Sequence, residues 1–250
     1  MILNNHHIMY RSIRPFLLTL IGLALFHTLS AQFYAGVEGG ASLNMLKTEI
    51  SNVNVTSYAP KAGWEVCIPL TLKIKFLLIE AEPSFIQKNT QLNWTGYFDG
   101  IYQTNFNGYL SMPLMAGYVF SVKHFDFIPQ LGGYIAWWAS GRVKGRMPNT
   151  FGVDTGVNNA NLNYISNTPT YTYDEPYTFE SRRDNRMEIG WLAGGTFAYH
   201  ICDCFKVFLN LKYYQAITDQ QKNYQLSQIP KYNRTGSLCV GLLYHVGNIF

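Results

Sequence analysis

Five glutamates stand at the polar positions of stretches in which apolar and polar residues alternate, and three basic residues occupy equivalent positions in later stretches. Alternation with a period of two places such side chains on one face of a sheet. Carboxylates and ammonium groups that share a face can form buried ion pairs, or they can relay a proton or an ion. The members of this set are Glu38, Glu65, Glu80, Glu82, Glu188, Lys206, Lys212 and His245, with Arg186 and Arg234 as further candidates.

The elements that must position these residues are β-strands. The alternation comes in eight blocks of roughly ten residues, which is the length of a tilted membrane-crossing strand. After residue 32 the sequence has no helical period of comparable length. The blocks cover residues 33–47, 64–70, 75–85, 109–120, 127–138, 187–199, 206–214 and 236–250.

The connections between the blocks alternate in length. Those after the second, fourth and sixth blocks are short, whereas the others are long and cover residues 48–63, 86–108, 139–186 and 215–234. Short turns at one end and long loops at the other are typical of outer-membrane barrels whose chain ends lie on the periplasmic side. We therefore predict an all-β fold, an eight-stranded antiparallel up-and-down transmembrane β-barrel over residues 32–250.

The composition of the two strand faces favours a membrane over water. The polar face carries mainly Gly, Ser, Ala and Cys, and charged residues make up 14% of the chain, against about 25% in ordinary soluble domains. An eight-stranded interior is just wide enough to be filled by side chains, which favours an ion-pair plug over an ion path. A soluble secreted barrel of the lipocalin type, which alternates in the same way, is the alternative fold.

Residues 1–31 have the pattern of a secretory signal peptide. The apolar run FLLTLIGLALF, residues 16–26, follows Arg11 and Arg14 and precedes the small residues Ser30 and Ala31. The run is shorter than the roughly 20 residues that a membrane-spanning helix needs. We predict cleavage near Ala31 and Gln32 and localisation in the bacterial outer membrane, with an uncleaved signal anchor as the alternative.

The chain ends on an alternating stretch, GSLCVGLLYHVGNIF, residues 236–250. A closed barrel has no free edge, so its last strand must pair with its first. Phe250, with Leu242, Tyr244 and Val246 before it in alternation, resembles the signal by which the barrel assembly machinery recognises its clients. We predict this machinery and outer-membrane lipid as partners. No Lys/Arg cluster of the kind that binds nucleic acid occurs.

The stretches YLSMPLMAGY, GGYIAWW, EIGWLAGGTF and FLNLKYYQAIT resemble the outer-membrane β-barrel family of Bacteroidetes often called PorT-like. The resemblance covers residues 33–250 and implies a barrel fold and an outer-membrane location. For some members it also implies a place in secretion or gliding machinery. The family commonly has an acidic residue where this chain has Ser111.

A lipid-modifying enzyme of the outer membrane is the alternative function. Such an enzyme needs a general base beside its nucleophile near the outer rim. After residue 32 the histidines are His124, His200 and His245, and the predicted topology places all three near the periplasmic side. We therefore expect no catalytic residues.

The sequence also offers His and Cys residues as metal ligands, because together they suit zinc. His124 lies on one predicted turn, and His200, Cys202 and Cys204 lie on another. Two strands separate these turns in the sequence, so we expect no metal site and no cofactor. Cys67 and Cys239 complete the four cysteines, which we expect to be free thiols or one labile bridge.

The long connection at residues 139–186 is the predicted binding surface. Loops longer than about 12–15 residues are uncommon unless they bind something or stay disordered. Its tyrosines offer large contact areas with few rotatable bonds. We expect binding or anchoring, to an envelope protein, an extracellular ligand or a glycan, and a self-packed cap over the barrel is the alternative. The residues concerned are Arg142, Lys144, Arg146, Tyr164, Tyr171, Tyr173 and Tyr177.

Overall fold

The computed structural model describes residues 31–48, 56–96, 99–148, 170–225 and 228–249. Of the predicted signal peptide, only Ala31 is among the described residues. Tyr164 and Phe250 also lie outside the described residues. Among the described residues, no helix is long and apolar enough to cross a membrane.

The described residues form a single sheet of thirteen strands, and every pairing in it is antiparallel. Their order along the chain is β1 (Ala31–Thr48), β2 (Thr56–Cys67), β3 (Leu70–Ile74), β4 (Leu77–Ala81), β5 (Ser84–Gln87), β6 (Thr90–Trp94), β7 (Tyr102–Tyr118), β8 (Phe120–Val122), β9 (Phe125–Pro148), β10 (Thr170–Pro176), β11 (Met187–His200), β12 (Phe205–Ala216) and β13 (Lys231–Ile249).

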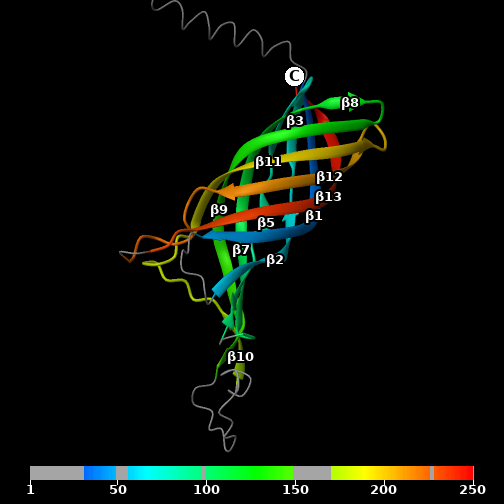
Figure 1. Cartoon of the computed structure of the whole chain (residues 1–250). Coiled ribbons are helices and arrows are strands. Elements are labelled where there is room, and N and C mark those ends of the chain that lie inside the picture. The colour runs from blue at the N-terminus through cyan, green and yellow to red at the C-terminus, as the bar shows by residue number, and fades with distance from the viewer. Residues whose placement is uncertain (1–30, 49–55, 97–98, 149–169, 226–227, 250) are drawn as a thin grey trace, which may run out of the picture.

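The sheet closes on itself through its first and last strands. β1 pairs with β13 along its whole length, from Ala31 opposite Ile249 to Thr48 opposite Lys231. From β1 the pairings run through β2 and β3, then β4 to β6, then β7, β9, β11 and β12, and return to β13. Figure 1 shows the strands winding around a common interior.

The ring is uneven because several strands are interrupted. Pro69 separates β2 from β3 and Pro83 separates β4 from β5, and proline has no N–H group to donate to a neighbouring strand. When β2 is counted with β3, β4 with β5 and β6, and β7 with β8, the ring contains the eight strands that the sequence predicts. β10 stands outside this ring, and among the described strands β9 is its one pairing partner.

The strand faces are divided as the alternation predicts. Large apolar side chains point outward, and Leu131 and Leu114 keep 63% and 59% of their surface exposed. Side chains one position away, such as Gln130 and Met115, are buried inside the ring. The interior therefore carries the polar and charged residues together with apolar side chains such as Met115, whereas the outside carries mainly apolar ones.

The predicted boundaries at the long-loop end are wrong. Residues 139–186 were expected to be one loop, but β9 continues to Pro148 and pairs there with β10, as Arg142 opposite Pro176 illustrates. β7 likewise begins at Tyr102, inside the expected loop 86–108. The outer ends of these strands have polar residues on both faces, so no period of two marks them in the sequence. Figure 1 shows β10 extending away from the ring.

Candidate functional site

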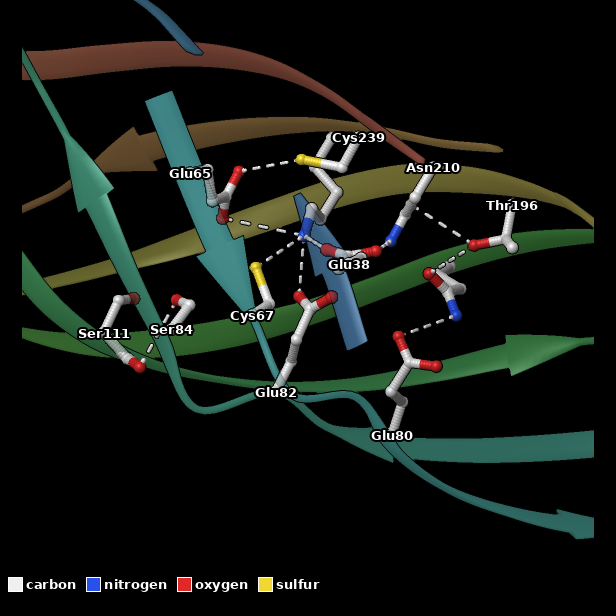
Figure 2. A network of polar contacts seen from close by, with 12 residues as sticks. Glu38, Glu65, Cys67, Glu80, Glu82, Ser84, Ser111, Thr196, Asn210 and Cys239 are labelled. Atoms are coloured by element: carbon white, nitrogen blue, oxygen red, sulfur yellow. Dashed lines mark hydrogen bonds and ion pairs between the residues drawn. The ribbon is translucent and has the colours of Figure 1, made fainter. Parts of the chain in front are cut away.

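The centre of the barrel holds one lysine among three glutamates. Lys212 Nζ lies 2.5 Å from an oxygen of Glu38, 2.8 Å from one of Glu82 and 3.6 Å from one of Glu65. It also lies 3.8 Å from the sulfur of Cys67. All four charged side chains are fully buried, and Figure 2 shows the glutamates and Cys67 converging on one point.

Neutral donors satisfy most of the remaining carboxylate oxygens. Tyr214 donates its hydroxyl to Glu65 over 2.8 Å, and Asn210 donates its amide to the second oxygen of Glu38 over 3.3 Å. Cys239 Sγ lies 3.6 Å from the other oxygen of Glu65. Among the described residues, the second oxygen of Glu82 has no hydrogen-bond partner. A deeply buried charge needs such partners, because desolvation otherwise outweighs the attraction within an ion pair.

The break between β4 and β5 positions Glu82. Its backbone N–H donates to the carbonyl of Pro113 over 3.1 Å, so the irregular segment remains tied to β7. Glu38 and Cys67 stand opposite each other on β1 and β2, and Lys212 comes from β12. The cluster therefore joins strands from opposite parts of the sequence.

A second layer lies toward the long-loop end. Glu188 forms an ion pair with Lys88, accepts a hydrogen bond from Tyr134 over 2.8 Å and accepts another from Asn233 over 2.6 Å. The ammonium of Lys88 stands 4.7–5.5 Å from the ring centres of three tyrosines, Tyr109, Tyr134 and Tyr214. Such cation–π contacts add to the ion pair, because aromatic faces attract cations.

Two further layers lie toward the short-turn end. Glu80 accepts a hydrogen bond from Thr71 over 2.8 Å and has Gln130 at 3.5 Å, but it forms no ion pair with any described residue. In the next layer toward the short-turn end, Asp126 accepts hydrogen bonds from Lys206 over 3.1 Å and from Ser121 over 2.6 Å.

The structure brings together only part of the predicted lumen set. Glu38, Glu65, Glu82 and Lys212 form one cluster, whereas Glu80, Glu188 and Lys206 belong to separate layers. His245 packs its ring against Tyr34 with 5.0 Å between the centres.

Arg186 and Arg234 were wrongly assigned to the lumen. The guanidinium of Arg186 lies over the rings of Trp137 and Phe179 and donates to the carbonyl of Trp138. Arg234 follows the buried residue Asn233 on β13, so it points away from the interior.

Sequence reasoning missed Lys88 and Asp126. Lys88 fell inside a predicted loop, and Asp126 preceded the predicted start of its strand. Their charge could have indicated them, because buried charges need partners of opposite sign. Lys88 is the partner of Glu188, and Asp126 is the partner of Lys206.

The layers leave little free space inside the ring. Tyr109, Tyr214, Met115 and Leu192 are fully buried between and around the charged groups. The cavity beside Glu80 and Lys206 has a volume of about 20 Å³, which is about the room that one water needs. Chemically this arrangement is a plug of ion pairs.

The donor atoms of Glu38, Cys67 and Glu82 lie within 4.8 Å of one another, which is a metal-like grouping. The ammonium of Lys212 sits among the same atoms and lies within 3.8 Å of a donor atom of each. The chain therefore places its own cation where a metal would bind.

The turns that carry His124 and His200 are neighbours, contrary to expectation. The backbone N–H of His200 donates to the carbonyl of His124 over 2.9 Å, because the end of β11 pairs with the start of β9. His200 Nε2 lies 2.7 Å from Asp126, and Ser121 donates to the other oxygen of that carboxylate. The histidine and the serine thus contact the carboxylate separately, which is not the nucleophile–base contact of a hydrolase.

The predicted binding residues lie on strands at the outer end. Arg142 and Lys144 on β9 lie 2.6 and 3.8 Å from oxygens of Asp174 on β10, and Arg146 donates to the hydroxyl of Thr170 over 3.0 Å. The hydroxyl of Tyr171 lies 3.7 Å from the sulfur of Met147, and Tyr173 donates to Gln103 over 3.2 Å.

Tyr177 belongs instead to the wall of the barrel mouth. It donates its hydroxyl to Asp184 over 2.9 Å. Burial is the larger cause and this hydrogen bond the next, and together they raise the pKa of Tyr177 to about 12. Burial alone would raise the pKa of Asp184, but hydrogen bonds from Arg183, the Glu180 backbone and Tyr177 outweigh it, so that pKa lies below its usual range. These residues lie between β10 and β11, beyond the apolar belt, which is the part of the ring whose outer face carries the exposed apolar side chains.

A polar cavity of about 270 Å³ opens at this end of the ring. Strands β1, β2, β6, β7, β9 and β13 contribute to it, together with the segments before β11 and before β13. Its floor is close to the outer ion-pair layer, because Gln220 lines the cavity and donates to the hydroxyl of Tyr109 over 3.3 Å.

No protein-family model matches the sequence, and no curated protein matches it. Solved structures that match include Neisserial surface protein A, at 13% identity and a TM-score of 0.38 over 86% of this chain and 98% of that chain. The attachment invasion locus protein Ail of Yersinia pestis matches at 11% and 0.35, over 84% and 98%. The N-terminal β-barrel domain of OprF from Pseudomonas aeruginosa matches at 10% and 0.27, over 84% and 97%. Likenesses at this level do not assign a function.

Proposed function

We propose that this protein is an outer-membrane β-barrel, exported by a signal peptide cleaved near Ala31 and Gln32, that acts by binding at its extracellular end and catalyses no reaction. The observation that carries the proposal is the inversion of polarity between the two faces of the ring. Leu131, Leu114 and Val240 are more than half exposed, whereas Glu65 and Lys212 are fully buried. Lipid suits such an outer face, and a closed ring leaves no strand edge unpaired in it.

Aromatic side chains support the same placement. At the short-turn end Phe125 packs against Tyr199 and Phe205 packs against Tyr244, with ring centres 5.0 and 5.1 Å apart. Trp191 stands nearer the other end and packs against Tyr213 at 5.8 Å. Aromatic residues gather at the two interfaces of a membrane, where an apolar ring meets polar headgroups.

The alternative of a soluble lipocalin-like barrel suits these features less well. A barrel of that type keeps room inside for a small ligand. Here the interior is filled by ion pairs, and a polar cavity of about 270 Å³ lies at the mouth. Binding at the mouth therefore fits the geometry better than binding within the lumen.

The resemblance to PorT-like barrels of Bacteroidetes fits this proposal. It adds proteins of the cell envelope as candidate partners, and with them a role accessory to secretion. The barrel assembly machinery is a further proposed partner, because β13 pairs along its length with β1 and so closes the ring without a free edge.

The four cysteines provide a direct test of the orientation. Cys202 and Cys204 are exposed in the turn between β11 and β12, whereas Cys67 and Cys239 are buried. On intact cells we expect a membrane-impermeant maleimide to leave the protein unlabelled. After the outer membrane is opened, Cys202 and Cys204 should react, and the buried pair should react only after unfolding.

A matched variant reports on the opposite end. In a Cys202→Ser, Cys204→Ser background, Tyr171→Cys places a thiol on the exposed face of β10. We expect this thiol to react on intact cells. Labelling of the native turn on intact cells, with Tyr171→Cys protected until the membrane is opened, would overturn the proposed function.

A further inference from the structure

We propose that the cavity at the outer mouth is a saccharide-binding site. This inference names the ligand class for the binding role proposed above, and it rests on that role. The cavity is formed by residues from several strands and two connecting segments, among them Tyr58 on β2, Asn105 on β7, Trp138 on β9 and Gln221 before β13.

The size of the cavity limits the ligand. Its volume of about 270 Å³ lies just below the range of about 300–1,000 Å³ that is usual for drug-sized ligands. One or two sugar rings would fill it. Beneath the cavity the Lys88–Glu188 layer closes the lumen, so the ligand must enter and leave by the same opening.

The polar groups of the wall are mainly side-chain amides. Gln103, Asn105, Asn107, Gln220 and Gln221 line the cavity. An amide both donates and accepts hydrogen bonds, as a sugar hydroxyl does, so the two can pair in either direction. A wall of carboxylates would offer acceptors only, and one of lysines would offer donors only.

Part of this wall is already oriented by its own hydrogen bonds. Gln103 donates one amide hydrogen to Asn105 over 2.9 Å and accepts a bond from Tyr173 over 3.2 Å. Its second amide hydrogen has no acceptor among the described residues. The side-chain amide of Gln221 makes no hydrogen bond to any described residue, so both of its groups are available to a ligand.

Two aromatic rings at the mouth offer apolar faces. Among the described residues, the rings of Tyr58 and Tyr224 stack against no other ring, and their hydroxyls have no hydrogen-bond partner. The C–H face of a pyranose can pack against such a ring, whose face carries partial negative charge. Trp138 has a different role, because Tyr109 and Tyr177 stack on it at 5.9 and 5.2 Å.

The charges favour a neutral or singly acidic sugar. Arg183 and Asp184 form an ion pair at 2.9 Å and so compensate each other, which leaves Lys231 as the uncompensated charge among the described lining residues. A phosphorylated or multiply sulfated ligand calls for several cations arranged together. The described lining of the cavity does not provide that arrangement.

Two outer segments are tied together beside the cavity. The backbone N–H of Lys222 donates to the carbonyl of Arg183 over 2.8 Å, and that of Asn185 donates to the carbonyl of Gln220 over 3.0 Å. Asp184 and Gln221 form a β-bridge between the same segments. A wall fixed in advance reduces the entropy lost when a ligand binds.

The test uses the full chain purified in detergent micelles and an array of immobilised glycans. The array carries neutral hexoses, N-acetylated hexosamines and sialylated sugars, and the free sugar of any positive is titrated by calorimetry. Gln221→Leu and Asn105→Leu should each weaken binding about tenfold, because each leaves hydroxyls of the sugar unpaired. Gln91→Leu is the matched control, since Gln91 bonds to Asn93 outside the cavity and its loss should leave the affinity unchanged.

Equal urea midpoints for the wild type and the three variants show that a lost affinity does not reflect misfolding. Absence of binding to every sugar class, or equal weakening by Gln91→Leu and Gln221→Leu, would overturn the saccharide site. The cysteine labelling is independent of it. Labelling of Tyr171→Cys on intact cells without any sugar binding would leave the proposed function standing and remove this inference alone.

Discussion

At the residue scale, Lys212 carries the electrostatic balance of the lumen. Three carboxylates surround its ammonium, and none of the four side chains reaches solvent. Replacement of such a cation leaves buried carboxylates without a counter-charge, and that costs more than the pair itself contributes.

Lys212→Met should therefore lower the free energy of unfolding by about 3–5 kcal/mol. Urea unfolding of the folded barrel in lipid vesicles measures the change. Lys144→Met removes an exposed lysine that lies 3.8 Å from Asp174, and it should cost less than about 1 kcal/mol. Adding Glu82→Gln to Lys212→Met should recover part of the loss. A Lys212→Met protein as stable as the Lys144→Met protein would contradict the plug.

Asp184 makes the outer wall sensitive to acid. Its pKa is lowered in the folded protein, so its stabilising effect is fully present above the unfolded value of about 3.9 and is lost as the pH falls through the lower folded value. We expect Asp184→Asn to be less stable than the wild type at pH 7, with the difference shrinking below about pH 4. Urea unfolding at a series of pH values measures it, and a difference independent of pH would refute this role.

The charged residues show what the sequence alone could predict. Glu38, Glu65 and Lys212 were placed inside correctly because each lies within a clear alternation. Lys88 was missed because Pro83 interrupts the pattern before it, and no period of two marks the polar residues that follow. The pairing of Glu188 with Lys88 also could not be predicted, because a sequence period gives the face of a residue but not its height in the barrel.

At the element scale, close contact between strands fixes where glycine is required. A Cβ at Gly132 on β9 would overlap the carbonyl oxygen of Leu114 and lie 2.8 Å from the Cα of Met115, both on β7. A Cβ at the neighbouring Gly133 would lie 3.6 Å from the carbonyl of Gly190, which is ordinary contact.

Gly132→Ala should therefore destabilise the barrel by about 1–3 kcal/mol, because β7 and β9 must move apart. Gly133→Ala, one residue away on the outer face, should change stability little. Thermal unfolding followed by circular dichroism compares the two variants under one condition. Equal melting temperatures would mean that the β7–β9 contact yields more easily than the geometry indicates.

Strand identity was easier to predict than strand length. The eight blocks correspond to the parts of the ring where one face is apolar, and there the alternation gave the correct face for Glu188 and Ile189 alike. Beyond that belt both faces of a strand meet polar surroundings, so β9 continues to Pro148 without a signal. For the same reason β10 could not be predicted from the sequence. Its pairing with β9 depends on backbone hydrogen bonds and on contacts such as that of Arg142 with Asp174.

At the scale of the whole molecule, the medium around the ring decides how its outer face responds to charge. Leu131 lies midway along the apolar part of β9, between Phe127 and Trp137, and 63% of its surface is exposed. Val122, 68% exposed, lies on β8 beside the turn at the short-turn end. In water these two positions are equivalent exposed sites, whereas in a membrane they differ in depth.

Leu131→Arg should lower the free energy of unfolding in lipid vesicles by about 2–4 kcal/mol, whereas Val122→Arg should cost about 0–1 kcal/mol, since an arginine near the interface reaches the headgroups. If the ring were a soluble barrel, both substitutions would stay within about 0.5 kcal/mol of the wild type, as exposed surface changes usually do. Urea titration of the three proteins after insertion into vesicles distinguishes these outcomes. A dependence on depth would follow from lipid contact, and equal small effects at both positions would exclude the membrane placement on which extracellular binding depends.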